Sequence, residues 1–382
     1  MKKSLIALVF LLTANMLKAQ EPINSEPNTK DKKEASFLLS GFGFTEVSKE
    51  DKSDEAMTYI GIHPIILWKK DRFFFEEELS LERMNGKTSL EVEFAVFHYK
   101  ICKGLELGAG KFLSPFGIFS ERIHPSWVNK FADNPLGFSH DAEFLAGPMT
   151  EFGFEAEGAL QFGPSKVNYV VYATNGPSLV TNDPMMNGML MFENIPDNND
   201  NKALGARIGF LPFSNSCFEI GLSQQIAKVG DKENETYRNV GASLSAIDLS
   251  FNHKLNFIKS NFELKAQYNT INVDKTVYMV DTSMTGVDSN FTSNSTAYFI
   301  QASLRPSFVE NDFLSRLELN WRYSHIELPE TAAWANHVSQ VTFGLNYWYS
   351  WRSVIKLNYQ TNENEYNKEQ SNKLFLQWGF GF

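Results

Sequence analysis

Apolar and polar side chains alternate with a period of two along most of the chain. Clear examples are the segments LEVEFAV, FGFEAEGAL and LGARIGF, which begin at Leu90, Phe152 and Leu204. A β-strand with one apolar face gives this period, whereas an amphipathic helix repeats its apolar positions every three to four residues. The pattern therefore predicts an all-β protein.

We expect sixteen strands, separated by turns and loops. Their predicted ranges are 36–46, 57–68, 72–83, 88–101, 104–113, 149–162, 165–174, 202–211, 216–228, 237–253, 261–272, 296–305, 312–325, 338–349, 352–361 and 372–382. The even-numbered joins are short, and the long joins, such as 114–148 and 175–201, are odd-numbered. Outer-membrane barrels have an even strand number, short turns at one end and long loops at the other. The sequence thus predicts a transmembrane antiparallel β-barrel of about sixteen strands over residues 36–382.

Composition and the first residues fit this fold. Aromatic residues make up 14% of the chain, yet its mean hydropathy is only −0.28, as expected where lipid-facing and lumen-facing residues alternate. Residues 1–20 combine Lys2 and Lys3 with an apolar block at 5–12 and Ala19, which is the layout of a cleaved signal peptide. We expect residues 21–35 to form a short periplasmic segment. The net charge of −10 disfavours nucleic acid as a partner.

The last predicted strand, LFLQWGFGF, carries large apolar residues on one face to its final position. Those residues are Leu374, Leu376, Trp378, Phe380 and Phe382. A strand of alternating apolar residues that ends in Phe resembles the assembly signal of Gram-negative outer-membrane proteins. The resemblance implies that the barrel-assembly machinery reads this segment, and that the protein lies among the lipid and lipopolysaccharide of the outer membrane.

A narrower resemblance covers most of the mature chain. The segments Leu107–Ile118, His124–Phe131, Tyr172–Pro177 and Leu204–Pro212 are similar to landmarks of the phosphate-selective porin O and P family, the second of them in the form found in Bacteroidetes relatives. The resemblance implies a sixteen-stranded homotrimeric porin whose third outer loop folds inward and narrows the pore. Such a porin would let small hydrophilic solutes diffuse passively.

The residues of that loop support the same interpretation. It contains four prolines and several large aromatic side chains, which would be costly to leave in water and should pack against the barrel wall. Packing over the outer rim or in a subunit contact remains the alternative. The candidate constriction residues are Pro115, Phe116, Arg122, Trp127, Lys130 and Phe131.

The polar face of the strands, taken as the lumen, carries more acids than bases, twelve to seven. The leading lumen charges are Glu76, Glu78, Glu91, Glu93, Glu155, Glu157, Arg207, Arg305, Arg316 and Arg322. An excess of carboxylates should attract cations, so the phosphate preference of the family is not carried over. The alternative is that acids and bases neutralise one another across neighbouring strands.

No catalytic or metal motif accompanies this pattern. The seven histidines are scattered without a nucleophile motif, and Asp197–Asn201 lacks the spacing of a calcium loop. We therefore expect neither an enzyme nor a cofactor nor a metal site. The leading function is a porin for small hydrophilic solutes or ions. The alternatives are a substrate-specific channel, for phosphate or another anion or for a small organic solute, and a non-conducting structural barrel.

Overall fold

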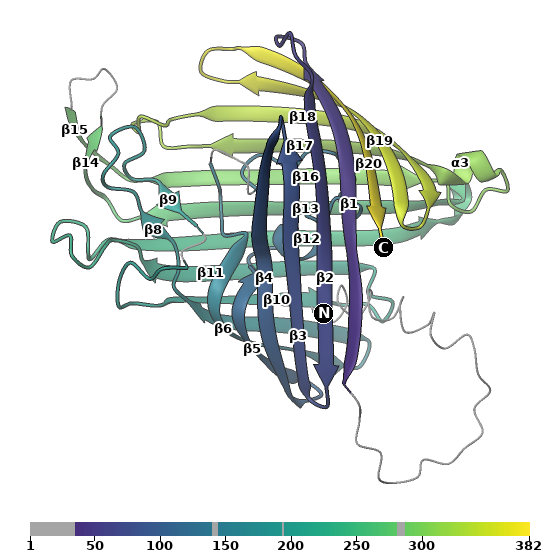
Figure 1. The fold of residues 1–382 in the computed structure, drawn as a ribbon, viewed down its shortest axis with the longest axis horizontal. Coiled ribbons are helices and arrows are strands. Elements are labelled where there is room, and N and C mark those ends of the chain that lie inside the picture. The colour runs from purple at the N-terminus through teal and green to yellow at the C-terminus, as the bar shows by residue number, and fades with distance from the viewer. Residues whose placement is uncertain (1–34, 140–143, 193–194, 281–286) are drawn as a thin grey trace.

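The computed structural model describes residues 35–139, 144–192, 195–280 and 287–382. The expected signal peptide, and all of the expected periplasmic segment except residue 35, lie outside the described residues. Sixteen antiparallel strands form a closed barrel (Figure 1). In barrel order they are β1 Ser36–Glu50, β2 Met57–Lys70, β3 Phe73–Met84, β4 Lys87–Cys102, β5 Leu105–Leu113, β6 Thr150–Phe162, β7 Ser165–Thr174, β10 Ala203–Leu211, β11 Phe218–Lys228, β12 Gly241–Leu255, β13 Ser260–Val273, β16 Asn294–Arg305, β17 Leu317–Glu327, β18 His337–Ser350, β19 Ser353–Asn364 and β20 Gln370–Gly381.

The remaining elements are short and lie in the joins. Two small hairpins, β8 Ser178–Leu179 with β9 Leu190–Met191 and β14 Thr276–Val280 with β15 Val287–Phe291, lie beyond one end of the barrel, opposite α3 Asp312–Arg316 (Figure 1). The others are α2 Phe119–Arg122 and the 3₁₀ turn Asn256–Ile258. None of the described helices is long and apolar enough to cross a membrane.

The predicted barrel is confirmed, and each predicted strand has its counterpart. The largest error is at 312–316, which was predicted as strand and forms α3. The Asn311 side chain accepts a 3.0 Å hydrogen bond from the Leu314 N–H, and this cap begins a helix. β12 also begins at Gly241 rather than 237, because Val240 N–H and Tyr237 N–H close turns onto Tyr237 O and Asn234 O at 2.8 and 3.1 Å.

The barrel closes by pairing its first and last strands. The β1–β20 register runs from Phe42↔Gly381 to Glu50↔Lys373. Beyond the last strand pair, Phe382 N–H donates to Gly41 O at 2.9 Å, and Gly41 N–H donates to Phe382 O at 3.1 Å. Phe382 is therefore part of the seam, and β20 has no free edge along this register.

The joins sort by length between the two ends, as predicted. At one end, called the turn end, strands are joined by tight turns such as 71–72, 103–104 and 163–164, with Pro306–Arg316 as the long exception. At the other, the loop end, lie the joins 114–149, 175–202 and 274–293. The short join Asn85-Gly86 at the loop end has φ values of 46° and 84°, which suit the two-residue hairpin turn that this sequence favours.

Alternation places apolar residues outside and mostly polar residues inside. Phe154 and Leu319 face outward and are 71% and 60% exposed, whereas Gln267 and Arg322 face inward and are 2% and 0% exposed. This arrangement inverts that of a soluble barrel and is typical of a barrel surrounded by lipid.

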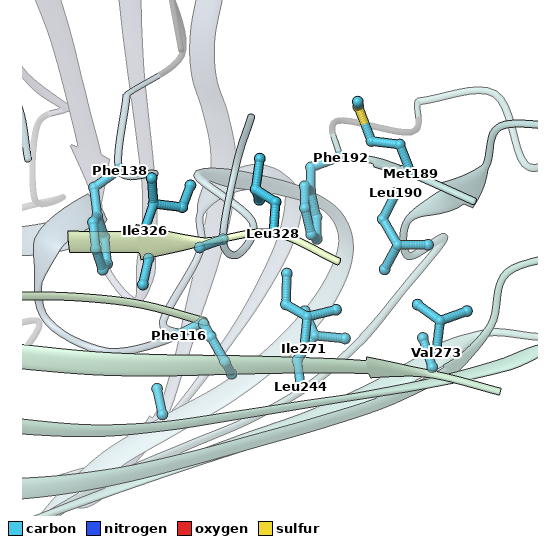
Figure 2. Close-up of a cluster of buried hydrophobic side chains, with 14 of the residues drawn as sticks. Phe116, Phe138, Met189, Leu190, Phe192, Leu244, Ile271, Val273, Ile326 and Leu328 are labelled. Carbon is cyan, nitrogen blue, oxygen red and sulfur yellow. The ribbon is translucent and has the colours of Figure 1, made fainter. Parts of the chain in front are cut away.

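An apolar core nevertheless lies inside the barrel, toward the loop end. It combines inward residues of β12, β13 and β17 with residues from the joins at the loop end. Figure 2 shows Phe116 and Phe138 of the 114–149 join beside Leu244, Ile271 and Ile326 of the barrel wall. From other joins come Met189, Leu190, Phe192 and Leu328. These side chains fill the part of the lumen next to β12–β17.

The strands differ in length around the barrel, so its wall extends further along the barrel axis on some sides than on others. β4 pairs with β3 up to Lys87↔Met84, but with β5 only from Ala95↔Lys111 onward. Within the described chain, no strand pairs with residues 87–94 on the β5 side. The strands that follow are shorter on the whole: β5, β7 and β10 have 9 or 10 residues and β6 has 13, against 12 to 16 for β1–β4. We call β5–β10 the low wall.

Candidate pore and its inner loop

The 114–149 join, called the inner loop, crosses the inside of the barrel. It leaves β5, yet the N–H groups of Ile118 and Phe119 donate to Gln267 Oε1 on β13 at 2.8 and 2.9 Å. The N–H of Gly117 donates to Ser223 Oγ on β11 at 3.0 Å. Since these side chains point inward from strands distant from β5 in the barrel, the loop lies in the lumen. The expected inward fold of this loop is confirmed.

Two buried basic side chains hold the middle of the inner loop through its carbonyl groups. Arg322 on β17 donates to Asp133 O at 2.8 Å and Asn134 O at 3.2 Å, and its guanidinium stacks on the Phe131 ring at 4.6 Å. Lys356 on β19 donates to Phe131 O at 3.1 Å and also to Ser126 O. A hydrogen bond to a charged group contributes about 1.5–3 kcal/mol, so these contacts fix the loop firmly.

Amide side chains complete this attachment. Asn346 Nδ2 donates to Lys130 O at 2.8 Å, Asn358 Oδ1 accepts from Ala132 N–H at 2.7 Å, and Gln377 Nε2 donates to Ala132 O at 3.3 Å. We call the inward faces of β11, β13 and β17–β20 the anchor wall. Its polar side chains replace water as partners of the loop backbone.

The two basic residues of the inner loop that were expected at the constriction form ion pairs with the barrel. Arg122 Nη1 lies 2.8 Å from Glu219 Oε2, and Lys130 Nζ lies 2.8 Å from Glu318 Oε1. Burial lowers the pKa of the Lys130 ammonium, but the carboxylates of Glu263 and Glu318 raise that pKa more, so it lies above its ordinary value of 10.5. Lys130 therefore stays charged and paired at neutral pH.

A cavity of about 610 Å³ remains between the inner loop and the inward faces of β1–β4. On the barrel side it is lined by Phe42, Phe44 and Tyr59, and on the loop side by Asn129, Phe131 and Asp133. β20 contributes Lys373, Phe375 and Gln377. This cavity is the candidate pore.

Acidic side chains dominate the candidate pore. Of the described residues that line it, six are carboxylates, one is a lysine, Lys373, and two are histidines, His63 and His124. The carboxylates are Glu46, Glu78, Glu82, Glu91, Glu93 and Asp133. The first five face the cavity from β1, β3 and β4, and we call this face the acidic wall. A lining with an excess of carboxylates in a confined space attracts cations.

Histidine and aromatic rings organise the acidic wall. His63 on β2 lies between two carboxylates, with Nδ1 3.1 Å from Glu78 Oε1 and Nε2 3.1 Å from Glu82 Oε1. The Phe42 ring stacks on the His63 ring with centroids 4.4 Å apart. At the seam, Gln377 Nε2 donates to Glu46 Oε2 at 2.9 Å. These contacts limit the rotamers of the wall.

The predicted constriction residues occupy four different environments. Phe116 belongs to the apolar core, and Pro115 beside it is also buried. Phe131 lines the cavity, whereas Arg122 and Lys130 reach into the anchor wall. Trp127 is half-buried near β20, where its ring lies 3.8 Å from the position of a Cβ built on Gly381.

The predicted lumen acids divide into two groups. Glu78, Glu91 and Glu93 line the cavity. Glu76 instead turns to His98, with Oε1 3.2 Å from Nε2. Glu155 and Glu157 are buried on the low wall near the same histidine.

The sequence predicted the positions of the lumen bases less well than those of the lumen acids. Arg207 is buried in a network with Asp248 and Glu219, at 2.7 and 3.3 Å, and Arg322 binds the inner loop as described. Arg305, the last residue of β16, donates through Nε to Ser315 O at 2.9 Å. Ser315 belongs to the Pro306–Arg316 join at the turn end. The expectation for Arg316 is wrong: it lies in α3, where Nη1 is 3.5 Å from Tyr349 O. The Asn311 cap removes it from the strand face.

The five residues of the expected assembly signal lie on one face of β20 and its extension. Leu374, Leu376, Trp378 and Phe382 are 39–53% exposed, and Phe380 is half-buried between the rings of Trp378 and Phe382, at 5.5 and 6.5 Å. Their outward orientation follows directly from the period of two.

Sequence reasoning missed the residues that hold the inner loop. Gln267, Asn346, Asn358 and Gln377 were not singled out, although each occupies a polar position of an alternating strand. Amides at inward positions of several strands were the available signal, because buried amides need partners and a loop backbone can supply them.

No protein-family model matches the chain, and no curated protein matches it. Solved structures do. The chain is similar to OmpF of Salmonella typhi, solved with daunomycin (11% identity over 91% of this chain and 97% of that chain, TM-score 0.59). It is also similar to the outer-membrane channel DcaP of Acinetobacter baumannii (13%, 92% and 99%, 0.56) and to an anion-selective porin from Comamonas acidovorans (14%, 91% and 100%, 0.55). At these identities the likeness shows the fold.

Proposed function

We propose that the protein is a channel of the Gram-negative outer membrane through which small hydrophilic solutes diffuse passively, with a preference for cations. The acidic cavity is the observation that carries this proposal. Its carboxylates line the open side of the lumen, whereas Arg122, Lys130, Arg322 and Lys356 bind partners on or near the anchor wall. The net field of the open side is therefore negative.

Reversal potentials in planar bilayers under a KCl gradient test this proposal. The wild-type channel should prefer K⁺ at low salt, and Glu91→Gln with Glu93→Gln should reduce that preference. Glu233→Gln with Glu235→Gln is the matched control, because both are exposed in the 229–240 join and face another groove. An anion preference in the wild type would contradict the proposal and favour the phosphate channel that the family resemblance implies.

A non-conducting barrel is the second candidate, since the apolar core fills the part of the lumen beside β12–β17. Conductance separates the two: a structural barrel stays silent in the bilayer. We expect ion currents, because the 610 Å³ cavity is lined by charged and polar groups that keep water inside. We expect no catalytic activity.

We further infer that the chain forms a homotrimer through the low wall and through residues 87–92 of β4. In the part of the chain that the structure describes, no strand pairs with residues 87–92 on the β5 side, and Lys111 Nζ donates to Val92 O there at 2.9 Å. Barrels in membranes do not leave open sheet edges to lipid, and a neighbouring subunit would cover this one. One similar structure, OmpT of Vibrio cholerae, is described as a trimer form (9% identity, TM-score 0.51).

Cross-linking in a background without Cys102 and Cys217 tests the trimer. Leu90→Cys, on residues 87–92 of β4, should give dimers joined by a disulfide, since one cysteine per chain forms one disulfide. Leu319→Cys also faces outward but lies on β17, and should give none. Equal cross-linking of both, or a monomeric mass in detergent, would contradict this contact.

We also propose that the segment Leu374–Phe382 is the assembly signal read by the barrel-assembly machinery. A lipid-facing charge costs about 0–1 kcal/mol near the membrane surface and about 2–4 kcal/mol at its midplane. Trp378→Asp with Phe380→Asp, or deletion of Phe382, should nevertheless abolish insertion through lost recognition. Leu319→Asp with Trp321→Asp adds the same number of lipid-facing charges at the same spacing outside the signal, and should insert. Equal levels of folded, heat-modifiable barrel in both variants would contradict a signal role.

A further inference from the structure

A second cluster of ionisable side chains lies on the inward face of β3–β6. His98 is at its centre, with Glu76, Glu106, Glu155 and Glu157 around it. His98, Glu155 and Glu157 are 2%, 3% and 6% exposed. None of the five lines the 610 Å³ cavity, so the cluster is separate from the candidate pore.

Strand register brings the cluster together. His98 on β4 and Glu155 on β6 both lie opposite Gly108 of the intervening β5. A Cβ on Gly108 would lie 2.8 Å from Cγ and Oε1 of Glu155, so the glutamate side chain occupies the space that this glycine leaves free. The next row pairs Glu106 with Glu157. Glycine in the middle strand thus allows side chains of β4 and β6 to meet above β5.

We propose that His98, Glu155 and Glu157 bind one divalent transition-metal ion. One donor atom from each residue lies within 4.8 Å of the others. Zn²⁺ binds imidazole nitrogen and carboxylate oxygen at about 2.0–2.2 Å, so donors around one ion are at most about 4.2 Å apart. Small rotations of the two glutamates bring the donors to that distance. Three protein ligands leave a position for water.

The surroundings of His98 support this assignment. Its Nε2 lies 3.2 Å from Glu76 Oε1, and its Nδ1 lies 3.4 Å from Glu106 Oε1. Whichever ring nitrogen binds the ion, the other lies within 3.4 Å of a carboxylate oxygen. Metal-binding histidines nearly always have such a partner, which fixes the tautomer and the ring orientation.

Charge and donor type indicate the class of ion. Carboxylates this close together repel one another, and a dication offsets that repulsion. Ca²⁺ and Mg²⁺ are bound almost entirely through oxygen, whereas an imidazole together with carboxylates suits Zn²⁺, Mn²⁺ or Fe²⁺. Binding would tie β4 to β6 across β5, where the barrel wall becomes low.

The test uses the full chain folded in detergent and stripped of metal by EDTA. Calorimetric titration with Zn²⁺ should show one ion bound per chain. In a thermal scan, Zn²⁺ should raise the unfolding temperature, since a ligand of the native state stabilises it. Co²⁺ should give the visible absorption of a site with nitrogen and oxygen ligands. His98→Gln or Glu157→Gln should weaken Zn²⁺ binding more than tenfold. Glu106→Gln should weaken it about tenfold, as expected for a partner of a metal ligand.

His63→Gln is the matched control, because His63 also lies inward between two carboxylates but outside the cluster. It should keep wild-type Zn²⁺ affinity. The proposal is overturned if the stripped wild type binds no stoichiometric Zn²⁺, if His98→Gln binds as tightly as the wild type, or if Ca²⁺ competes equally. Should His98→Gln fail to fold, Glu106→Gln and the Co²⁺ spectrum of the wild type decide the matter. None of these measurements depends on conduction.

Discussion

The acidic wall and the anchor wall come from the same strand pattern but have different partners. Both carry charged or amide side chains on the inward face of alternating strands. On the anchor wall, Gln267, Arg322 and Lys356 bind the inner-loop backbone. On the acidic wall, Glu91 and Glu93 line the cavity. A count of lumen charges therefore says little about the field in the pore, because the bases on one side are already neutralised or shielded.

The difference between the two walls also explains how an inner loop rich in aromatic residues is stable inside the lumen. Its apolar side chains pack into the core beside β12–β17, and its backbone is bound by the anchor wall. The loop thus lies against one half of the barrel and leaves the other half open. The open half is consequently eccentric, next to β1–β4.

The largest expected effect comes from removing the inner loop. Replacing residues 116–138 with a short Gly-Ser linker abolishes the contact that distinguishes the two walls. Single-channel conductance should rise several-fold, because the lumen beside the anchor wall is no longer filled. Replacement of residues 51–56, a join outside the lumen lining, is the control. Unchanged conductance in a folded barrel would mean that the loop does not limit the current.

A smaller effect is expected from releasing the loop without removing it. Arg322→Met leaves the Asp133 and Asn134 carbonyls without their charged donor, at a cost of about 1.5–3 kcal/mol in the free energy of unfolding. The current through the channel should also become noisier as the loop moves. Arg316→Met at the turn end is the control and should change neither. Quiet current and unchanged stability in Arg322→Met would show that the amides alone hold the loop.

Much of this fold follows from the sequence alone, for a specific reason. Every strand of a barrel must alternate, so segments such as Phe152–Leu160 carry the signal locally. The short helix at 312–316 was not predicted, because its cap, Asn311, is a single residue beside a run of alternating apolar and polar residues. One side chain changed the local structure without changing the period.

The site was less predictable, because alternation fixes the face of a residue and not its partner. Glu78 and Glu76 are two residues apart on one face of β3, yet the first lines the cavity and the second turns to His98. Arg322 lies inside the barrel, but its role depends on the path of a loop far away in the sequence, since its partner Asp133 is 189 residues earlier. Such long-range contacts leave no period in the sequence.

A modest effect should follow from removing the lysine of the cavity. Lys373→Gln removes the positive charge of this lysine from the cavity lining. One unit charge at about 8 Å in water is worth about 0.5 kcal/mol, with opposite sign for a cation and an anion, so the ratio of cation to anion permeability should rise about fivefold. Lys232→Gln, in an exposed join, is the control. The effect should fade between 0.1 M and 1 M KCl, since the screening length falls from about 10 Å to about 3 Å. A salt-independent ratio would point to a steric origin.

The smallest expected change concerns pH and the Lys130–Glu318 pair that joins the inner loop to the anchor wall. The pKa of Lys130 lies above its ordinary value of 10.5, because nearby carboxylates outweigh the effect of burial. A raised pKa in the folded state gives a stabilisation that is complete below the unfolded-state value and is lost as pH rises through the folded-state value. The difference in unfolding free energy between the wild type and Lys130→Gln should therefore stay constant from about pH 7 to 10 and shrink only above about pH 10.5. Chemical unfolding in detergent at several pH values measures it, with Lys232→Gln as the exposed control. A difference that already shrinks below pH 9 would mean that burial outweighs the carboxylates, and that the anchor wall holds the loop with a neutral lysine.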